Sequence, residues 1–213
     1  MMNKKHFINV SKSACVVTQG NPELASNLWI VLHGYGQLAE NFQKNFQIFD
    51  DRHYFVFPNA LNNFYLKSSR GEVGSSWMTK YERENDIEDN NNYLNQVYEK
   101  FIQPYYFDGK SLIVLGFSQG AATLIRWLAM NNTKVDKLIV WGAVFPPDMN
   151  QMNYLKNLKQ LEWLYFVGTN DEFISTEEKE LQKNFFTENN FNLRWIEYEG
   201  KHALMPEVLS NYI

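Results

Sequence analysis

Short, nearly continuous apolar runs recur along the chain, and a stretch with helical spacing follows most of them. The runs are rich in β-branched and aromatic residues and occupy residues 28–32, 54–57, 112–115, 138–141 and 161–167. Strands that are apolar at every position are typical of a parallel sheet that helices cover on both faces. The more alternating residues 193–198 predict an outer strand, and residues 14–17 predict an antiparallel edge strand.

Helical patterns fill the intervals between these runs. They are expected near residues 38–48, 84–103, 119–131, 175–189 and 204–212. Ser175 followed by Thr176, Glu177 and Glu178 is typical of a helix N-terminus. The alternation predicts the α/β class, with a mostly parallel, doubly wound sheet and helices on both faces, in a single domain over residues 1–213. In such sheets, ligands bind at the carboxyl ends of the strands.

The charge balance and the single cysteine narrow the class of protein. Lys and Arg total 20 and Asp and Glu total 24, so the net charge of −4 argues against a nucleic-acid-binding protein, which normally carries a basic surface. Cys15 alone forms neither a disulfide framework nor a Cys-rich zinc site, and it fits a reducing compartment.

Residues 1–6 are not followed by an apolar signal-peptide block. The longest apolar runs are about five residues, against the roughly 20 that span a membrane, so we expect a cytoplasmic protein.

The segment Gly116-Phe117-Ser118-Gln119-Gly120 is the strongest sign of chemistry in the sequence. It follows a predicted buried strand and begins a predicted helix, which is the context of a nucleophile elbow. In such an elbow the serine adopts a strained backbone conformation on a tight turn, and larger side chains at the flanking glycines would collide. The N-terminal N–H groups of the helix then point at the same place. Ser118 is therefore the candidate nucleophile.

A serine nucleophile needs a base, and the chain offers four histidines. His6 lies in the N-terminal stretch, and His53 begins a strand and is expected to be exposed. His33, after the first buried strand, is expected to brace a loop. His202 lies in the loop between the last strand and the last helix, and it alone has the chain order Ser, acid, His expected for this kind of site. We therefore predict His202 as the base.

The acid that orients the base is expected on a loop between Ser118 and His202. Asp171 follows the predicted strand 161–167 and is the first choice. Glu172 is the neighbouring alternative, and Asp148, which follows the strand at 138–141, is a weaker one.

The loop His33-Gly34-Tyr35-Gly36 follows the first buried strand, where the second oxyanion donor of this arrangement is found. Its glycines allow the backbone to approach an oxyanion closely. We assign the backbone N–H groups of Tyr35 and Gln119 as the two donors.

These segments resemble the small α/β-hydrolases of the phospholipase/carboxylesterase family, which includes the acyl-protein thioesterases. The likeness rests on residues 32–36, 116–120, 168–171 and 200–202, with a further match at Ser76-Trp77-Met78, and together they span nearly the whole chain. Met78 replaces a frequent Phe of the family, and Tyr35 replaces a frequent Leu. The resemblance implies an α/β-hydrolase fold without a large cap domain, the triad Ser118, Asp171 and His202, and hydrolysis of carboxyl esters or thioesters without metal or cofactor.

The substrate is expected to be a small molecule with a small to medium acyl group. Loops after the strands supply the candidate substrate-binding residues, namely Trp77, Phe145, Phe173 and Met205. Two other functions stay open: a peptidase on the same fold, and a ligand-binding module without catalysis. An exposed edge strand or an aromatic patch would allow two copies of the chain to form a homodimer.

Overall fold

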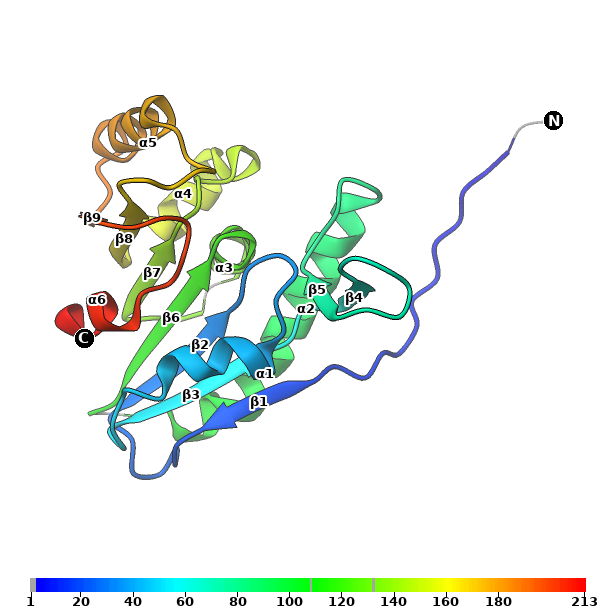
Figure 1. The fold of residues 1–213 in the computed structure, drawn as a ribbon, viewed down its shortest axis with the longest axis horizontal. Coiled ribbons are helices and arrows are strands. Elements are labelled where there is room, and N and C mark those ends of the chain that lie inside the picture. Colours follow the sequence, from blue (N-terminus) through cyan, green and yellow to red (C-terminus); the bar gives the residue numbers. More distant parts are fainter. Residues whose placement is uncertain (1–2, 108, 132) are drawn as a thin grey trace.

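A seven-stranded sheet forms the centre of the computed structural model, which describes residues 3–107, 109–131 and 133–213 and so leaves Met1 and Met2 of the N-terminal stretch outside the described residues (Figure 1). The strand order is β1-β3-β2-β6-β7-β8-β9, and only the pairing of β1 with β3 is antiparallel. The strands are β1 (Val16–Gln19), β2 (Asn27–Leu32), β3 (His53–Pro58), β6 (Ser111–Phe117), β7 (Lys137–Trp141), β8 (Glu162–Gly168) and β9 (Leu193–Tyr198). The predicted mostly parallel sheet is confirmed.

Helices cover both faces of this sheet. They are α1 (Ala39–Phe42), α2 (Arg83–Phe101), α3 (Gln119–Met130), α4 (Met152–Leu158), α5 (Thr176–Glu188) and α6 (Pro206–Leu209), with short 3₁₀ turns at Gln43–Phe46, Gln103–Tyr105, Pro147–Met149 and Ser210–Tyr212. One apolar core contains side chains of α2, α3, α4 and α5, and the second contains side chains of α1 and α6. The described residues contain no cap domain, and none of their helices has the length and apolarity needed to cross a bilayer.

Strand β2 shows why the buried strands are apolar at every position. Leu28, Ile30 and Leu32 belong to the core under α2 and α3, whereas Trp29 and Val31 belong to the core under α1. Successive side chains of a strand point to opposite faces, so a sheet with helices on both faces buries both sets. The carboxyl ends of β2, β6, β7, β8 and β9 meet along one edge of the sheet, because these strands run parallel.

Three elements were not anticipated from the sequence. Strands β4 (Asn62–Tyr65) and β5 (Val73–Ser76) form a separate antiparallel hairpin, and α4 precedes β8. Both hairpin strands have four residues; β4 alternates between exposed and more buried positions, and β5 buries a glycine and two serines, so neither has the continuous apolar run that identifies the main strands. The hairpin lies against the loop after β2, where Gly36 N–H donates to Ser75 O at 2.8 Å.

His53 contradicts the expectation that it is exposed. Its side chain is buried in the core beneath α1, and Trp29 Nε1 donates a hydrogen bond to His53 Nδ1 at 3.0 Å. Burial is the main cause of a lowered pKa for His53. The polar residues Asp50, Asp51 and Arg52 just before it suggested a surface position. The strand nevertheless turns the imidazole inward, where the indole of Trp29 satisfies one ring nitrogen.

An ion-pair network joins α3 to the loop after β7. Arg126 is buried and donates from Nε and Nη2 to the Asp148 carboxylate at 2.7 and 2.8 Å, and Arg83 of α2 adds a contact at 2.9 Å. Partial burial acts to raise the pKa of Asp148, but the hydrogen bonds of Arg126 and Arg83 and the charge of Arg126 outweigh it and hold the pKa at about 2.

This network predicts a pH-dependent stability difference in Asp148→Asn. Because the folded-state pKa is lowered, the stabilisation is complete above the unfolded value of about 3.9 and is lost as the pH falls through about 2. After a discount for the 29% exposed side chain, we expect the variant to lose about 1–2 kcal/mol of unfolding free energy at pH 6, and roughly half as much at pH 3. Urea unfolding at both pH values measures this. Asp51→Asn, at an exposed position, is the control, and an Asp148→Asn deficit independent of pH would contradict the prediction.

Candidate active site

Ser118 occupies the turn between β6 and α3, and its backbone is strained. Its φ of 54° and ψ of −120° are sparsely populated for a residue with a side chain. A Cβ at Gly116 would lie 2.3 Å from Ala121 Cα, and one at Gly120 would lie 2.5 Å from the carbonyl oxygens of Leu32 and His33. Only glycine therefore fits at these two positions, and the serine is held at the N-terminus of α3, with its own N–H donating to Trp141 O at 2.8 Å.

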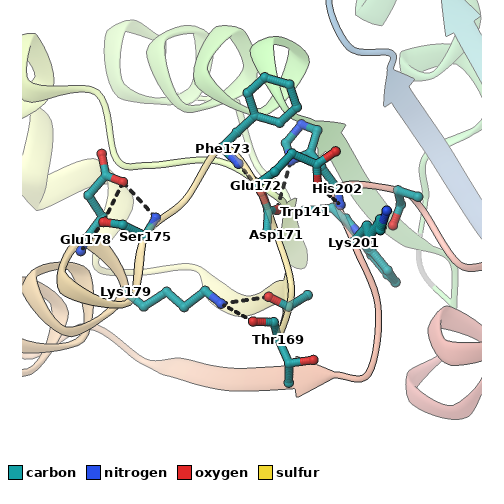
Figure 2. Close-up of polar contacts among 12 residues, drawn as sticks. Trp141, Thr169, Asp171, Glu172, Phe173, Ser175, Glu178, Lys179, Lys201 and His202 are labelled. Carbon is teal, nitrogen blue, oxygen red and sulfur yellow. Dashed lines mark hydrogen bonds and ion pairs between the residues drawn. The ribbon is translucent and has the colours of Figure 1, made fainter.

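His202 and Asp171 are joined by a hydrogen bond of 2.8 Å between Nδ1 and Oδ2 (Figure 2). A carboxylate only accepts, so Nδ1 carries the proton and Nε2 is left as the acceptor. The Asp171 side chain is fully buried, and its other oxygen accepts from the Phe173 N–H at 2.9 Å. The imidazole is 11% exposed, so its free edge can reach a ligand. This is the tautomer that a general base needs.

The imidazole of His202 packs against Phe117, which precedes Ser118, and against Gly142, which follows the neighbouring strand β7. Its ring centroid lies 5.0 Å from that of Phe117, and a Cβ at Gly142 would lie 3.1 Å from His202 Cε1. Gly142 follows Trp141, whose carbonyl holds the Ser118 N–H. Within the described residues, no hydrogen bond joins the Ser118 hydroxyl to His202; such contacts often tighten only when substrate binds.

The two alternative acids occupy different positions. Asp148 is engaged by Arg126 and Arg83, as described above. Glu172 accepts a hydrogen bond from the backbone N–H of His202 at 3.2 Å rather than from its ring. Of the three carboxylates weighed from the sequence, Asp171 is the one that contacts the imidazole.

The backbone N–H groups of Tyr35 and Gln119 face no protein acceptor among the residues that the structure describes. Their neighbours differ: Gly34 N–H donates to Gln37 Oε1 at 2.8 Å, and Gly36 N–H donates to Ser75 O. Gln119 is the first residue of α3, where the backbone donors lack an intrahelical acceptor. Both amides are therefore available to an oxyanion.

His33 is fully buried behind this loop. Ala60 N–H donates to its Nε2 at 3.1 Å, so its Nδ1 carries the proton and donates to Gly34 O at 2.8 Å. Burial lowers the pKa of His33 to about 4, and the bond to Gly34 offsets this only in part. Near neutral pH, His33 is therefore an uncharged brace of the loop, as the sequence predicted.

The Gln119 side chain has a role that the sequence did not reveal. Its Oε1 accepts from Trp77 N–H at 2.9 Å, and its Nε2 donates to Met78 O at 2.8 Å. This pair of bonds fixes the loop after β5 beside Ser118.

The four predicted substrate-binding residues lie in different environments. Trp77 is fully buried and donates from its indole to His33 O, and Phe145 is buried among aromatic rings of α5 and β8. Met205 is partly buried against the core under α6. Phe173 is 69% exposed, and its ring lies 4.7 Å from that of His202. Phe173 alone of the four combines exposure with contact to the proposed triad. Among the described residues, no three His, Cys, Asp or Glu side chains gather as metal ligands would.

Comparisons with known proteins point to one family of hydrolases. The family model described as Phospholipase/Carboxylesterase matches residues 13–212. Three similar solved structures are acyl-protein thioesterase 2 of Zea mays (12% identity, TM-score 0.71, covering 93% of this chain and 96% of that one), a carboxylesterase of Bacillus cereus (19%, 0.69, 93% and 91%) and a phospholipase/carboxylesterase of Dyadobacter fermentans (17%, 0.69, 96% and 98%). At these identities the structures show a shared fold. No curated protein sequence matches the chain.

The family match covers nearly the whole chain, and the sheet order, the strained serine and the His–Asp pair agree with it. The chain therefore belongs to the phospholipase/carboxylesterase family, and it is a hydrolase of the carboxylesterase type.

Proposed function

We propose that this hydrolase cleaves carboxylic esters, including thioesters, of small to medium acyl groups through Ser118, His202 and Asp171. The observation that carries the proposal is the His202–Asp171 hydrogen bond, next to a serine in a strained turn. Asp171 keeps the proton on Nδ1, so Nε2 is free to accept the proton of Ser118. Ser118 then attacks the carbonyl carbon, and the tetrahedral oxyanion accepts hydrogen bonds from the Tyr35 and Gln119 amides.

The remaining steps use the same groups. His202 returns its proton to the leaving alcohol or thiol, which frees an acyl-enzyme on Ser118. Water then attacks this ester with His202 again accepting a proton, and the acid is released as Ser118 recovers its hydrogen. The cationic imidazole formed in each half of the cycle lies against a fully buried carboxylate, which stabilises it.

Two exposed aromatic rings support the choice of an apolar acyl group. Phe173 borders His202, and Tyr35, 59% exposed, stands on the proposed oxyanion loop against Phe64 of the hairpin. Exposed aromatic side chains at a reaction centre offer apolar area that a ligand can bury. A cytoplasmic location and the pairing of two copies stay predictions from the sequence.

Removal of the nucleophile tests the proposal. Ser118→Ala is expected to lose about 10⁴- to 10⁶-fold in kcat for a p-nitrophenyl ester, because no hydroxyl remains to form the acyl-enzyme. A fluorophosphonate is expected to add one adduct to Ser118 of the parent protein and none to the variant, by intact-mass and peptide analysis. A folded parent protein that takes up no adduct would refute the proposal and favour a binding module without catalysis.

Replacement of the acid separates Asp171 from Asp148. Asp171→Asn is expected to lower kcat by about 10⁴-fold, because the amide no longer holds the proton on Nδ1. Asp148→Asn is the matched control: it breaks an ion pair at a distance from the imidazole, and we expect kcat within about threefold of the parent. Steady-state kinetics at 25 °C measure both. The acid assignment is wrong if the two variants exchange their effects.

The acyl contact predicted for Phe173 has its own test. Phe173→Ala is expected to raise KM about three- to tenfold for p-nitrophenyl hexanoate, because a longer acyl chain loses apolar contact area. The acetate ester, too short to reach the ring, is expected to change less than about twofold. Leu181→Ala, at a similarly exposed position (66%) on α5, is the control. A KM increase of the same size for both esters would count against the contact.

A further inference from the structure

Lys179 is a buried lysine that the proposed mechanism does not use. It lies on α5, is 6% exposed, and its amino group donates to Gly168 O at 2.7 Å and to Thr169 O at 3.1 Å (Figure 2). Its position is unusual, because Lys179 and Phe186, seven residues apart, are the buried residues of this helix, whereas Leu181 is exposed. An amphipathic helix normally places an apolar side chain at that position.

The two carbonyls that Lys179 binds belong to the segment leading to the proposed acid. Gly168 ends β8, and Asp171 N–H donates to Gly168 O as well, at 3.3 Å. The same segment holds the loop of the proposed base: Thr169 N–H donates to Tyr198 O, and Asn170 N–H to Gly200 O, each at 2.9 Å. A Cβ at Gly168 would lie 2.5 Å from Gly200 O, so the two backbones touch here.

The backbone that carries the Lys179 side chain is held in the ordered first turns of α5. Ser175 and Glu178 form a reciprocal capping box at the start of α5, with Glu178 N–H donating to Ser175 Oγ at 3.2 Å and Ser175 N–H donating to Glu178 Oε2 at 2.8 Å. Lys179 N–H donates to Ser175 O at 3.0 Å and continues the helix. A long side chain therefore runs from an ordered first turn to the loop, where its amino group makes a buried bond to Gly168 O and a partly buried bond to Thr169 O.

We propose that Lys179 is a positioning residue, which holds the 168–171 loop so that Asp171 keeps its hydrogen bond to His202. This inference rests on the proposed function of Asp171 and adds a residue to it. Loss of the amino group removes this donor from Thr169 O and leaves Gly168 O with the longer bond from Asp171 N–H alone, so the loop shifts to satisfy the two carbonyls. A displacement of the order of 1 Å at a reacting group lowers a rate by about 100-fold, so a small movement of Asp171 is enough.

The test compares Lys179→Met with Lys183→Met. Both replace a lysine of α5 by an apolar side chain of similar length, but Lys183 pairs with Glu180 and Glu197 rather than with the loop. We expect Lys179→Met to lower kcat for a p-nitrophenyl ester about 10- to 100-fold with KM unchanged within about twofold. Lys183→Met is expected to keep both constants. Thermal unfolding of each variant shows whether it is folded at the assay temperature.

A double-mutant cycle separates positioning from general destabilisation. The rate of Ser118 phosphonylation by a fluorophosphonate, followed by intact mass, is measured for Lys179→Met in the parent and in the Asp171→Asn background. If Lys179 acts through Asp171, its 10- to 100-fold effect falls to less than about twofold in the second background. An equal effect in both backgrounds, an unchanged kcat, or a change confined to KM would overturn the proposal.

Two further controls keep the outcome interpretable. Should Lys179→Met fail to fold, it is replaced by Lys179→Gln, which keeps an N–H donor on a shorter side chain. The same outcomes for kcat, KM and the double-mutant cycle decide, and the expected loss of kcat is smaller. Ser118→Ala is run beside every variant. Full activity of Ser118→Ala would refute the proposed function itself, whereas a dead Ser118→Ala with a fully active Lys179→Met refutes only the role of Lys179.

Discussion

The contact between the first turn of α3 and the end of β2 is the constraint on which the site depends. Gly120 approaches the carbonyl oxygens of Leu32 and His33 so closely that a Cβ would lie 2.5 Å from both. This approach places the N-terminus of α3 directly beside the loop after β2, and thus brings the Gln119 and Tyr35 amides to the same edge of the sheet. It also forces Ser118 into its strained conformation, because the chain must reverse between β6 and α3 within one residue. The packed sheet offsets this strain, since both faces of β6 are buried.

The proposed acid and base approach the same edge from β8 and β9, which are neighbouring parallel strands. Parallel pairing with Gly168 opposite Tyr198 aligns the ends of the two strands, so the loops that follow them start side by side. The hydrogen bonds of Thr169 and Asn170 to Tyr198 and Gly200 then join the loops by backbone contacts. The 2.8 Å bond between Asp171 and His202 therefore continues a series of hydrogen bonds that starts with the pairing of β8 and β9 in the sheet.

Sequence patterns predicted the features that depend on local chemistry or on burial of whole strands. The apolar runs located five of the seven strands of the main sheet, and the segments 193–198 and 14–17 located the outer strand β9 and the edge strand β1. The Gly-x-Ser-x-Gly segment located the elbow, because the tight turn requires glycine on both sides of the serine. Features that depend on contacts between distant segments escaped prediction. His53 is buried because Trp29, 24 residues earlier, offers it an indole N–H, and Lys179 is buried because two carbonyls 10 and 11 residues earlier accept its N–H groups. Trp77 was predicted to bind substrate, but its side chain is fully buried and its indole N–H donates a hydrogen bond to His33 O.

A chain of hydrogen bonds links the two proposed oxyanion donors, and it explains why a glutamine suits the position after the serine. The backbone of Gln119 supplies one donor, while its side chain pairs with the backbone of Trp77 and Met78. Trp77 then donates to His33 O, and the ring of His33 is held by Ala60 N–H and donates to Gly34 O beside Tyr35. Because burial keeps His33 uncharged, this circuit retains its directions as the pH falls toward 4. A side chain at position 119 that lacks either an acceptor or a donor would lose one of the bonds to Trp77 and Met78. The series of hydrogen bonds that runs from Gln119 to the Tyr35 loop would then be interrupted at its start.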